Sequence, residues 1–185
     1  MTAILHRPPS TGGCPLAWCM ADSGCTTHEA GEGDLHFGRP SSVGTYDGDD
    51  LVVRPYRFDY ACVGEASETT GSRVEVGADY CNRVTVPLTP PQASVFADAV
   101  YAAARRNATG EVTIEVDPDD PESRSVTISS DVETVRLRGF EYDLIRLTFR
   151  APDESDGTTV VQVDAWDAAA FARYVKAAAE EVAQC

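Results

Sequence analysis

The sequence predicts an α+β fold with a mainly antiparallel sheet and two amphipathic, alanine-rich helices. Short segments of alternating apolar and polar residues, separated by Asp, Pro and Gly, occur in two runs, and these predict strands. Each run ends in a helical segment, the first at residues 89–107 and the second at 165–184. A cysteine- and histidine-rich segment precedes both runs and predicts a zinc-knuckle-like loop segment.

The first run of predicted strands covers residues 51–63, 72–77 and 82–88. In the first of them, Pro55 cannot donate a backbone hydrogen bond, so its part of the strand is expected at an edge or a bulge. Alternation places four residues of this strand on one face, namely Tyr56, Phe58, Tyr60 and Cys62.

The helix at 89–107 has a well-defined predicted start. Thr89 is the N-cap, Pro90 occupies the first helical position, and Gln92 completes a capping box. Helical spacing predicts a buried stripe that consists of Ala93, Phe96, Ala97, Val100 and Ala104.

The second run returns to strand patterns and ends in the second helix, which Asp164 is expected to cap. Asp, Pro and Gly residues in the turns divide this run into separate strands. The predicted strands are 111–116, 125–130, 133–139, 142–150 and 158–163.

The two helices and the strands before them align with each other. Residues 86–105 align without a gap on residues 161–180, which places both N-caps, Thr89 and Asp164, at one position. Phe96 then aligns with Phe171. Any two alanine-rich amphipathic helices can be aligned somewhere, but here caps, phenylalanines and preceding strands agree in one register. The pattern therefore favours a duplicated unit of strands followed by a helix, although one matched segment is limited evidence of a repeat.

These patterns divide the chain into five parts. We expect a disordered tail at 1–13, a metal-binding loop segment at 14–38, a linker at 39–50, and two strands-plus-helix units at 51–107 and 108–185. Because the segment 14–38 has few apolar residues, we expect the metal to order that segment alone while the two units fold without it.

The segment CPLAWCMADSGCTTHEAGEGDLHFG (14–38) contains three cysteines and two histidines. Zinc takes about four nitrogen or sulfur ligands in a tetrahedron, and a short pair of cysteines is the usual first half of such a site. We therefore predict a zinc site with Cys14, Cys19, His28 and His36 as ligands, with Cys25 as an alternative to one histidine.

Two other interpretations of this segment were considered. The cysteines and histidines could have accumulated by drift in a disordered tail, but burial does not explain so many of them beside Trp18. A catalytic metal would need an open coordination position and a general base, for which Glu29 and Glu32 are the nearby candidates. Four protein ligands favour a structural ion.

The N-terminal pattern also resembles a known family. CPLAWC (14–19), the spaced histidines and LTPPQA (88–93) before an alanine-rich helix are similar to a family of small actinobacterial and phage proteins, described as a domain of unknown function. The resemblance covers roughly 14–107, and it implies that six residues belong together, namely Cys14, Pro15, Trp18, Cys19, His28 and His36. It departs from the family pattern by one extra residue at Leu16-Ala17 and by Cys25, and it implies no activity.

Composition and charge exclude several function classes. The formal net charge of −15 opposes sequence-independent binding to nucleic acid. No apolar run is long enough for a bilayer crossing, and residues 1–13 lack the apolar stretch of a signal peptide, so we expect no membrane association and a cytoplasmic location. No nucleophile, P-loop or dinucleotide-binding motif is present, so we predict no catalytic residues and no organic cofactor.

The acidic turns at 47–50 and 117–122 do not match a calcium loop and are expected to be solvated hairpin turns. Cys62 and Cys81 lie in strand patterns and are expected to be core residues.

The sequence therefore favours a non-enzymatic, zinc-stabilised adaptor or regulatory protein that acts through contacts with a protein partner. One alternative is an acidic mimic of nucleic acid that serves a phage or mobile element, because the net charge is strongly negative. The solubility-promoting surface of an acid-rich proteome is the favoured explanation of that charge. Another alternative is a phage structural protein, whose location would be the virion.

Overall fold

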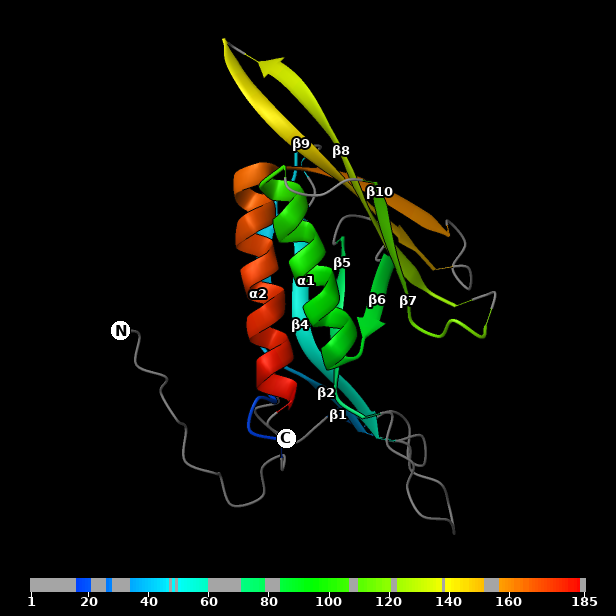
Figure 1. Cartoon of the computed structure of the whole chain (residues 1–185). Helices are drawn as coiled ribbons and strands as arrows, with labels where there is room; N and C mark the ends of the chain where they lie inside the picture. The colour runs from blue at the N-terminus through cyan, green and yellow to red at the C-terminus, as the bar shows by residue number, and fades with distance from the viewer. Residues whose placement is uncertain are drawn as a thin grey trace.

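The computed structural model shows an α+β fold with two antiparallel sheets and two helices in its described part (Figure 1). One hydrophobic core includes side chains from both sheets and both helices. The structure describes residues 16–20, 26–27, 34–46, 48, 50–59, 71–78, 84–106, 110–120, 123–137, 139–151 and 157–183.

The first sheet is organised around one long strand. Its strands are β1 (Thr26–Thr27), β2 (Asp34–Phe37), β3 (Ser41–Gly44), β4 (Asp50–Asp59), β5 (Arg73–Ala78) and β6 (Val84–Leu88). One edge of β4 pairs with β3 along its first half and with β2 along its second half, and the other edge pairs with β5. Gly38 lies where the chain passes from β2 to β3, and a Cβ there would lie 2.6 Å from Cγ of Pro55. Only glycine allows this close passage.

The second sheet is a four-stranded meander of β7 (Glu111–Glu115), β8 (Ser125–Leu137), β9 (Phe140–Arg150) and β10 (Thr158–Asp164). The strands predicted at 125–130 and 133–139 are one continuous strand, which corrects the prediction. The register between β8 and β9 shifts between Ser129 and Glu133, and this bulge interrupts the alternation that marks a single strand. The far end of the β8–β9 hairpin projects beyond the helices (Figure 1).

The helices are α1 (Pro90–Ala104) and α2 (Ala165–Ala183). The predicted capping box is confirmed, because Thr89 and Gln92 each bond to the backbone N–H of the other. At α2, the carboxylate of Asp164 accepts hydrogen bonds from the backbone N–H groups of Trp166 and Asp167. The predicted stripe is buried in both helices, except that Ala104 is partly exposed.

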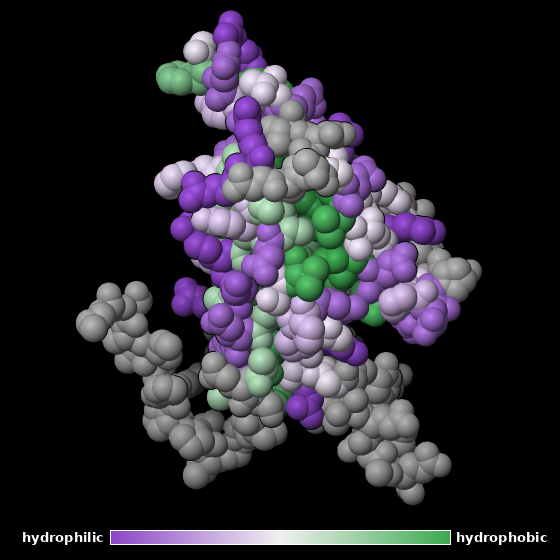
Figure 2. Space-filling model, viewed as in Figure 1, coloured by the Kyte–Doolittle hydropathy of each residue, from purple (hydrophilic) through white to green (hydrophobic). Residues whose placement is uncertain are grey.

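The helices pack side by side, and each also contacts the sheet of the other half (Figure 1). α2 contacts β3, β4 and β5 of the first sheet, and α1 contacts β7 and β8 of the second. At the helix contact, the rings of Phe96 and Phe171 meet edge to face with centroids 6.2 Å apart. Hydrophobic residues gather beside α1, on the side that faces away from α2 (Figure 2).

Strand registers show that β3–β6–α1 and β7–β10–α2 follow one plan. In both, a four-stranded meander leads directly into a helix. Leu51 pairs with Val43 and Ala78, and Val126 pairs with Ile114 and Phe149, all of which are buried. When this register is continued through β6 and β10, Thr89 aligns with Asp164. The helix sequences predict the same alignment. The repeated unit is therefore confirmed in strand order, register and core positions.

Two predicted boundaries differ from the structure. The predicted linker 39–50 contains strand β3, which pairs with β4. Its Val43 is buried, whereas its other residues are polar or glycine, so the alternation was too short to be recognised. The predicted loop segment 14–38 contains β2, and its Leu16 and Trp18 belong to the common core. The described part of this segment is therefore packed on the common core and is not separate from the folded units.

Candidate functional site

Two of the five predicted metal ligands, Cys19 and His36, lie within the described residues. Cys14, Cys25 and His28 lie outside them. Among the described residues, no group of three or more His, Cys, Asp and Glu side chains is arranged to hold a metal ion. The complete four-ligand site thus stays a prediction. The structure shows the local environment of two of its ligands, Cys19 and His36.

Cys19 ends a tight turn that is anchored in the core. Its backbone N–H donates to the carbonyl oxygen of Leu16 at 3.1 Å, which closes the turn. Leu16 and Trp18 are buried on either side of the exposed Ala17, so the turn is held by two apolar anchors. Cys19 is partly buried, packs against the core and is a free cysteine.

His36 lies on β2, opposite Arg57 of β4. Paired residues and residues two apart share a face of a sheet, so His36 is on the same face as the buried Val53 and Pro55. Its side chain is 2% exposed. A buried imidazole is a common metal ligand and is equally common as a hydrogen-bonded core residue.

One backbone hydrogen bond joins the turn to the strand. The N–H of Met20 donates to the carbonyl oxygen of Phe37 at 3.1 Å. Met20 and Phe37 directly follow Cys19 and His36, so the fold brings the first knuckle of the predicted site to the strand that carries the last ligand. A soft thiolate and an imidazole in this relation fit the donor chemistry of zinc.

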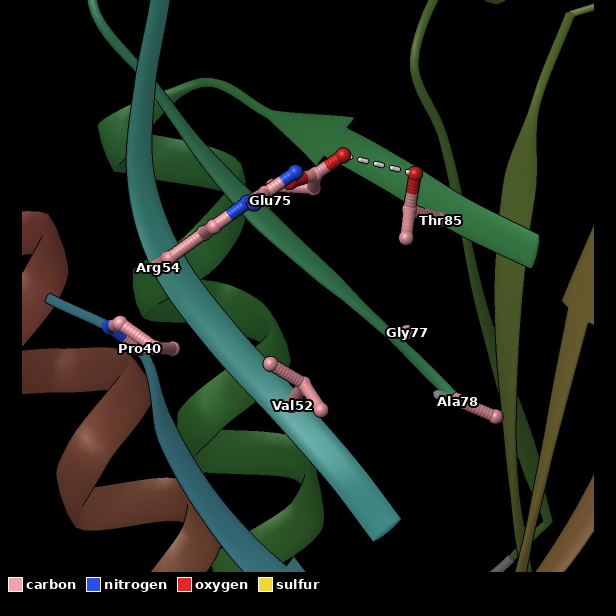
Figure 3. A pocket seen from close by; sticks show the side chains of 7 residues that line it. All are labelled: Pro40, Val52, Arg54, Glu75, Gly77, Ala78 and Thr85. Carbon is pink, nitrogen blue, oxygen red and sulfur yellow. Dashed lines mark hydrogen bonds and ion pairs between the residues drawn. The ribbon is translucent and has the colours of Figure 1, made fainter. Parts of the chain in front are cut away.

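The outer face of the first sheet has a small hollow of about 90 Å³ (Figure 3). Arg54 forms an ion pair with Glu75, and Glu75 also accepts a hydrogen bond from the hydroxyl of Thr85 at 2.8 Å. The guanidinium of Arg54 lies over the ring of Phe37 at 5.4 Å. Because these charged groups are paired with each other, the hollow offers no free base or nucleophile, and we assign it no chemistry.

The described part of the predicted acidic turn, residues 117–120, lies in the connection between β7 and β8, as predicted. The side chain of Asp117 accepts a hydrogen bond from the backbone N–H of Asp119, and Ser123 Oγ accepts one from the N–H of Asp117. The described acids here are exposed. Cys62, Cys81 and Cys185 lie outside the described residues.

Sequence reasoning missed an acidic cavity at the start of α2. It is lined by Gly44, Thr45, Tyr46, Tyr142, Asp164 and Asp167. Burial, the charge of Asp164 and a hydrogen bond with Asp164 together raise the pKa of the Asp167 carboxyl. The sequence signal was the pair of aspartates that flank Ala165 and Trp166, but we interpreted Asp164 as a cap alone.

No family model, no curated protein and no solved structure matches the chain. Neither helix in the described part combines the length and apolar character that crossing a bilayer requires.

Proposed function

We propose that the chain is a non-enzymatic adaptor that acts by contacting another protein, with a structural zinc ion in its N-terminal segment. The observation that carries the proposal is the exposure of large aromatic side chains on the second unit. Trp166 is 81% exposed and Phe140 is 68% exposed. Aromatic residues are enriched in protein interfaces and frequently dominate their binding energy.

The exposed aromatics lie on two different elements of one unit. Trp166 is in the first turn of α2, and Phe140 begins β9 at the end of the projecting hairpin. Trp and Phe are among the residues that most often anchor protein interfaces, so these two side chains support a role in contact. We assign no catalytic residue.

The zinc part of the proposal is supported by the anchored turn of Cys19 and its link to the strand of His36. Four protein ligands would close the coordination shell and leave no position for substrate. The ligands are Cys14, Cys19, His28 and His36, with Cys25 as the alternative. The cytoplasmic location and the family resemblance stay predictions.

Elemental analysis tests the metal. Protein purified without chelator should contain about one zinc per chain. Cys19→Ser changes one atom of a predicted ligand and should abolish the zinc content, whereas Cys62→Ser should retain it. Metal-free wild-type protein, or equal zinc in both variants, would contradict the site.

Affinity capture from the native host tests the adaptor. The wild-type chain should retain one salt-resistant protein partner, and Trp166→Ala should lose it. Val95→Ala is a matched control, because Val95 is 55% exposed on the other helix. Capture of DNA-binding proteins that elute with salt would instead favour the nucleic-acid mimic, and capture of capsid or tail proteins would favour the virion role.

A further inference from the structure

The cavity at the start of α2 has no role in the function proposed above. Its volume is about 380 Å³, within the range of small-ligand sites. The β3–β4 loop contributes Thr45 and Tyr46, β9 contributes Tyr142, and the start of α2 contributes Asp164 and Asp167. No basic side chain is among its described lining residues.

Backbone contacts hold the walls of the cavity in place. The N–H of Tyr46 donates to the carbonyl oxygen of Gln162 at 2.7 Å, which fastens the β3–β4 loop to β10. Asp164 pairs with Leu144 at the end of β10. Tyr142 is two residues from Leu144 on β9, so it lies on the same face of the sheet as Asp164. The two tyrosines and the acidic pair are therefore placed by regular structure.

The equivalent position in the first unit is closed. By the strand and helix registers, Gln92 corresponds to Asp167, and Glu115 and Val116 correspond to Gly44 and Thr45. The side-chain amide of Gln92 donates to the carbonyl oxygens of Glu115 at 2.8 Å and Val116 at 3.3 Å. The amide of Gln92 thus connects the start of α1 to the end of β7.

The second helix start lacks such a donor. An ionised Asp167 carries no N–H, so it cannot make the bonds that Gln92 makes. Burial, together with the neighbouring carboxyl of Asp164, instead disfavours ionisation of Asp167 and raises its pKa. The hydroxyl oxygen of Thr45 is buried and has no hydrogen-bond partner among the described residues. The cavity therefore combines negative charge, acceptor oxygens and aromatic rings.

We propose that this cavity binds a guanidinium group, presented by an arginine side chain of a protein partner; the source of the arginine rests on the proposed adaptor function. A guanidinium carries five N–H donors and a permanent positive charge. It matches the acidic pair in charge, and its planar face stacks on tyrosine rings. It supplies from outside the donors that Gln92 supplies at the start of α1.

Titration of the full chain with acetyl-arginine amide, followed by NMR, tests this inference. Acetyl-citrulline amide is the matched control probe, because citrulline has nearly the same shape without the charge. The arginine probe should shift the tyrosine ring signals saturably, and the citrulline probe should bind at least about tenfold more weakly. A third probe, acetyl-lysine amide, carries the same charge without the planar group. Absence of saturable shifts, or binding of the citrulline or lysine probe as tight as that of the arginine probe, would overturn the guanidinium assignment.

Variants locate the binding. Asp167→Gln introduces the residue that the first unit has at this position, so the fold should persist, and affinity for the arginine probe should fall about tenfold or more. Tyr142→Leu removes one ring and should also weaken binding. Glu180→Gln removes the same charge from an exposed position of α2 and should leave the affinity unchanged. Unchanged affinity in both Asp167→Gln and Tyr142→Leu would overturn the assignment.

The outcomes separate this inference from the proposed function. If the arginine probe binds in the cavity while host extracts yield no partner, the inference stands and the adaptor proposal fails. If a partner is captured through Trp166 but the arginine probe does not bind, the adaptor proposal stands and the inference fails.

Discussion

The unit β3–β6–α1 and the unit β7–β10–α2 have the same strand order and register but differ where each helix begins. At α1, the amide of Gln92 bridges to the end of β7. At α2, Asp167 stands at the same position, and a cavity lies between the helix start and the β3–β4 loop. The two units thus have the same backbone arrangement at the helix start but different side chains. Gln92 closes the gap to the neighbouring strand, whereas Asp167 leaves a cavity that is a candidate binding site.

The units also differ at their first long strands. Next to the first unit, β2 pairs with the edge of β4 beside β3, and the turn that ends in Cys19 is bonded to β2. In the second unit, the corresponding part of β8 continues with β9 into the projecting hairpin that carries Phe140. The edge of β4 is therefore covered by the N-terminal segment. Within the described residues the second unit has no such cover, and its hairpin leaves the side chain of Phe140 exposed.

The largest expected effect concerns what the two units share. Phe96 and Phe171 occupy equivalent positions and contact each other at the helix interface. Each is fully buried, so Phe96→Ala and Phe171→Ala should each destabilise the protein by about 3–5 kcal/mol. Urea unfolding followed by far-UV circular dichroism should show similar losses in both variants and one cooperative transition.

A control at the surface sharpens this comparison. Val95→Ala truncates an exposed residue of α1 and should change stability by less than about 0.5 kcal/mol. Two separate unfolding transitions, with each variant shifting one of them, would show that the units fold independently in spite of their common core.

The second expected effect distinguishes the edges of the two units. Removal of zinc should lower amide protection in β2 and the adjoining part of β4, because the Cys19 turn is bonded to β2. Protection in β8 and β9 should change little, since they lie in the other sheet. Hydrogen exchange with and without chelator measures the amide protection of each strand. An equal loss of protection in both sheets would contradict the expectation that the effect is limited to the first sheet.

The sequence was sufficient for elements whose pattern is local. The capping box of Thr89 and Gln92 and the stripe through Phe96 were predicted correctly because a helix start and a helical face each depend on neighbouring residues. The repeat was recognised from one aligned segment, and the strand registers extend it across both sheets.

The remaining features depend on contacts between distant residues. β3 has one buried residue, and its strand character comes from pairing with β4. Trp18 is buried because the turn packs on the core, which no local pattern shows. The cavity of Tyr46, Tyr142 and Asp167 brings together three distant parts of the chain. Its residues could be recognised only after the register had identified Asp167 as the counterpart of Gln92.

The third prediction compares the two helix starts directly. Gln92→Ala removes the capping-box partner of Thr89 and the bonds to the end of β7, so it should destabilise the protein by about 1–2 kcal/mol. Asp167→Ala removes a carboxyl whose contact with Asp164 is unfavourable, so it should change stability by less than about 0.5 kcal/mol. Thermal unfolding of both variants gives the comparison, and a larger loss at Asp167 would show that its carboxyl makes a stabilising contact.

The smallest expected effect is the pH dependence of Asp167. Burial and the neighbouring Asp164 raise its pKa above the ordinary 3.8, so the folded protein holds a proton that the unfolded chain has released. The contribution of this group to stability is therefore complete below the ordinary value and decreases as pH rises through the raised value. Asp167→Asn should be nearly equal to wild type at about pH 3 and more stable at neutral pH, by less than about 1 kcal/mol because the side chain is partly exposed.

The dipole of α2 opposes this effect, because an ionised carboxylate in the first helical turn is favourable by roughly 0.3–1 kcal/mol. Denaturant unfolding at a series of pH values decides which influence is larger. A stability difference that moves in favour of wild type as pH rises would show that the dipole dominates, and that the Asp167 carboxylate is stable at the helix start without a cation. Movement in favour of Asp167→Asn, reversed by added acetyl-arginine amide, would show that the cavity carries an uncompensated charge that a guanidinium neutralises.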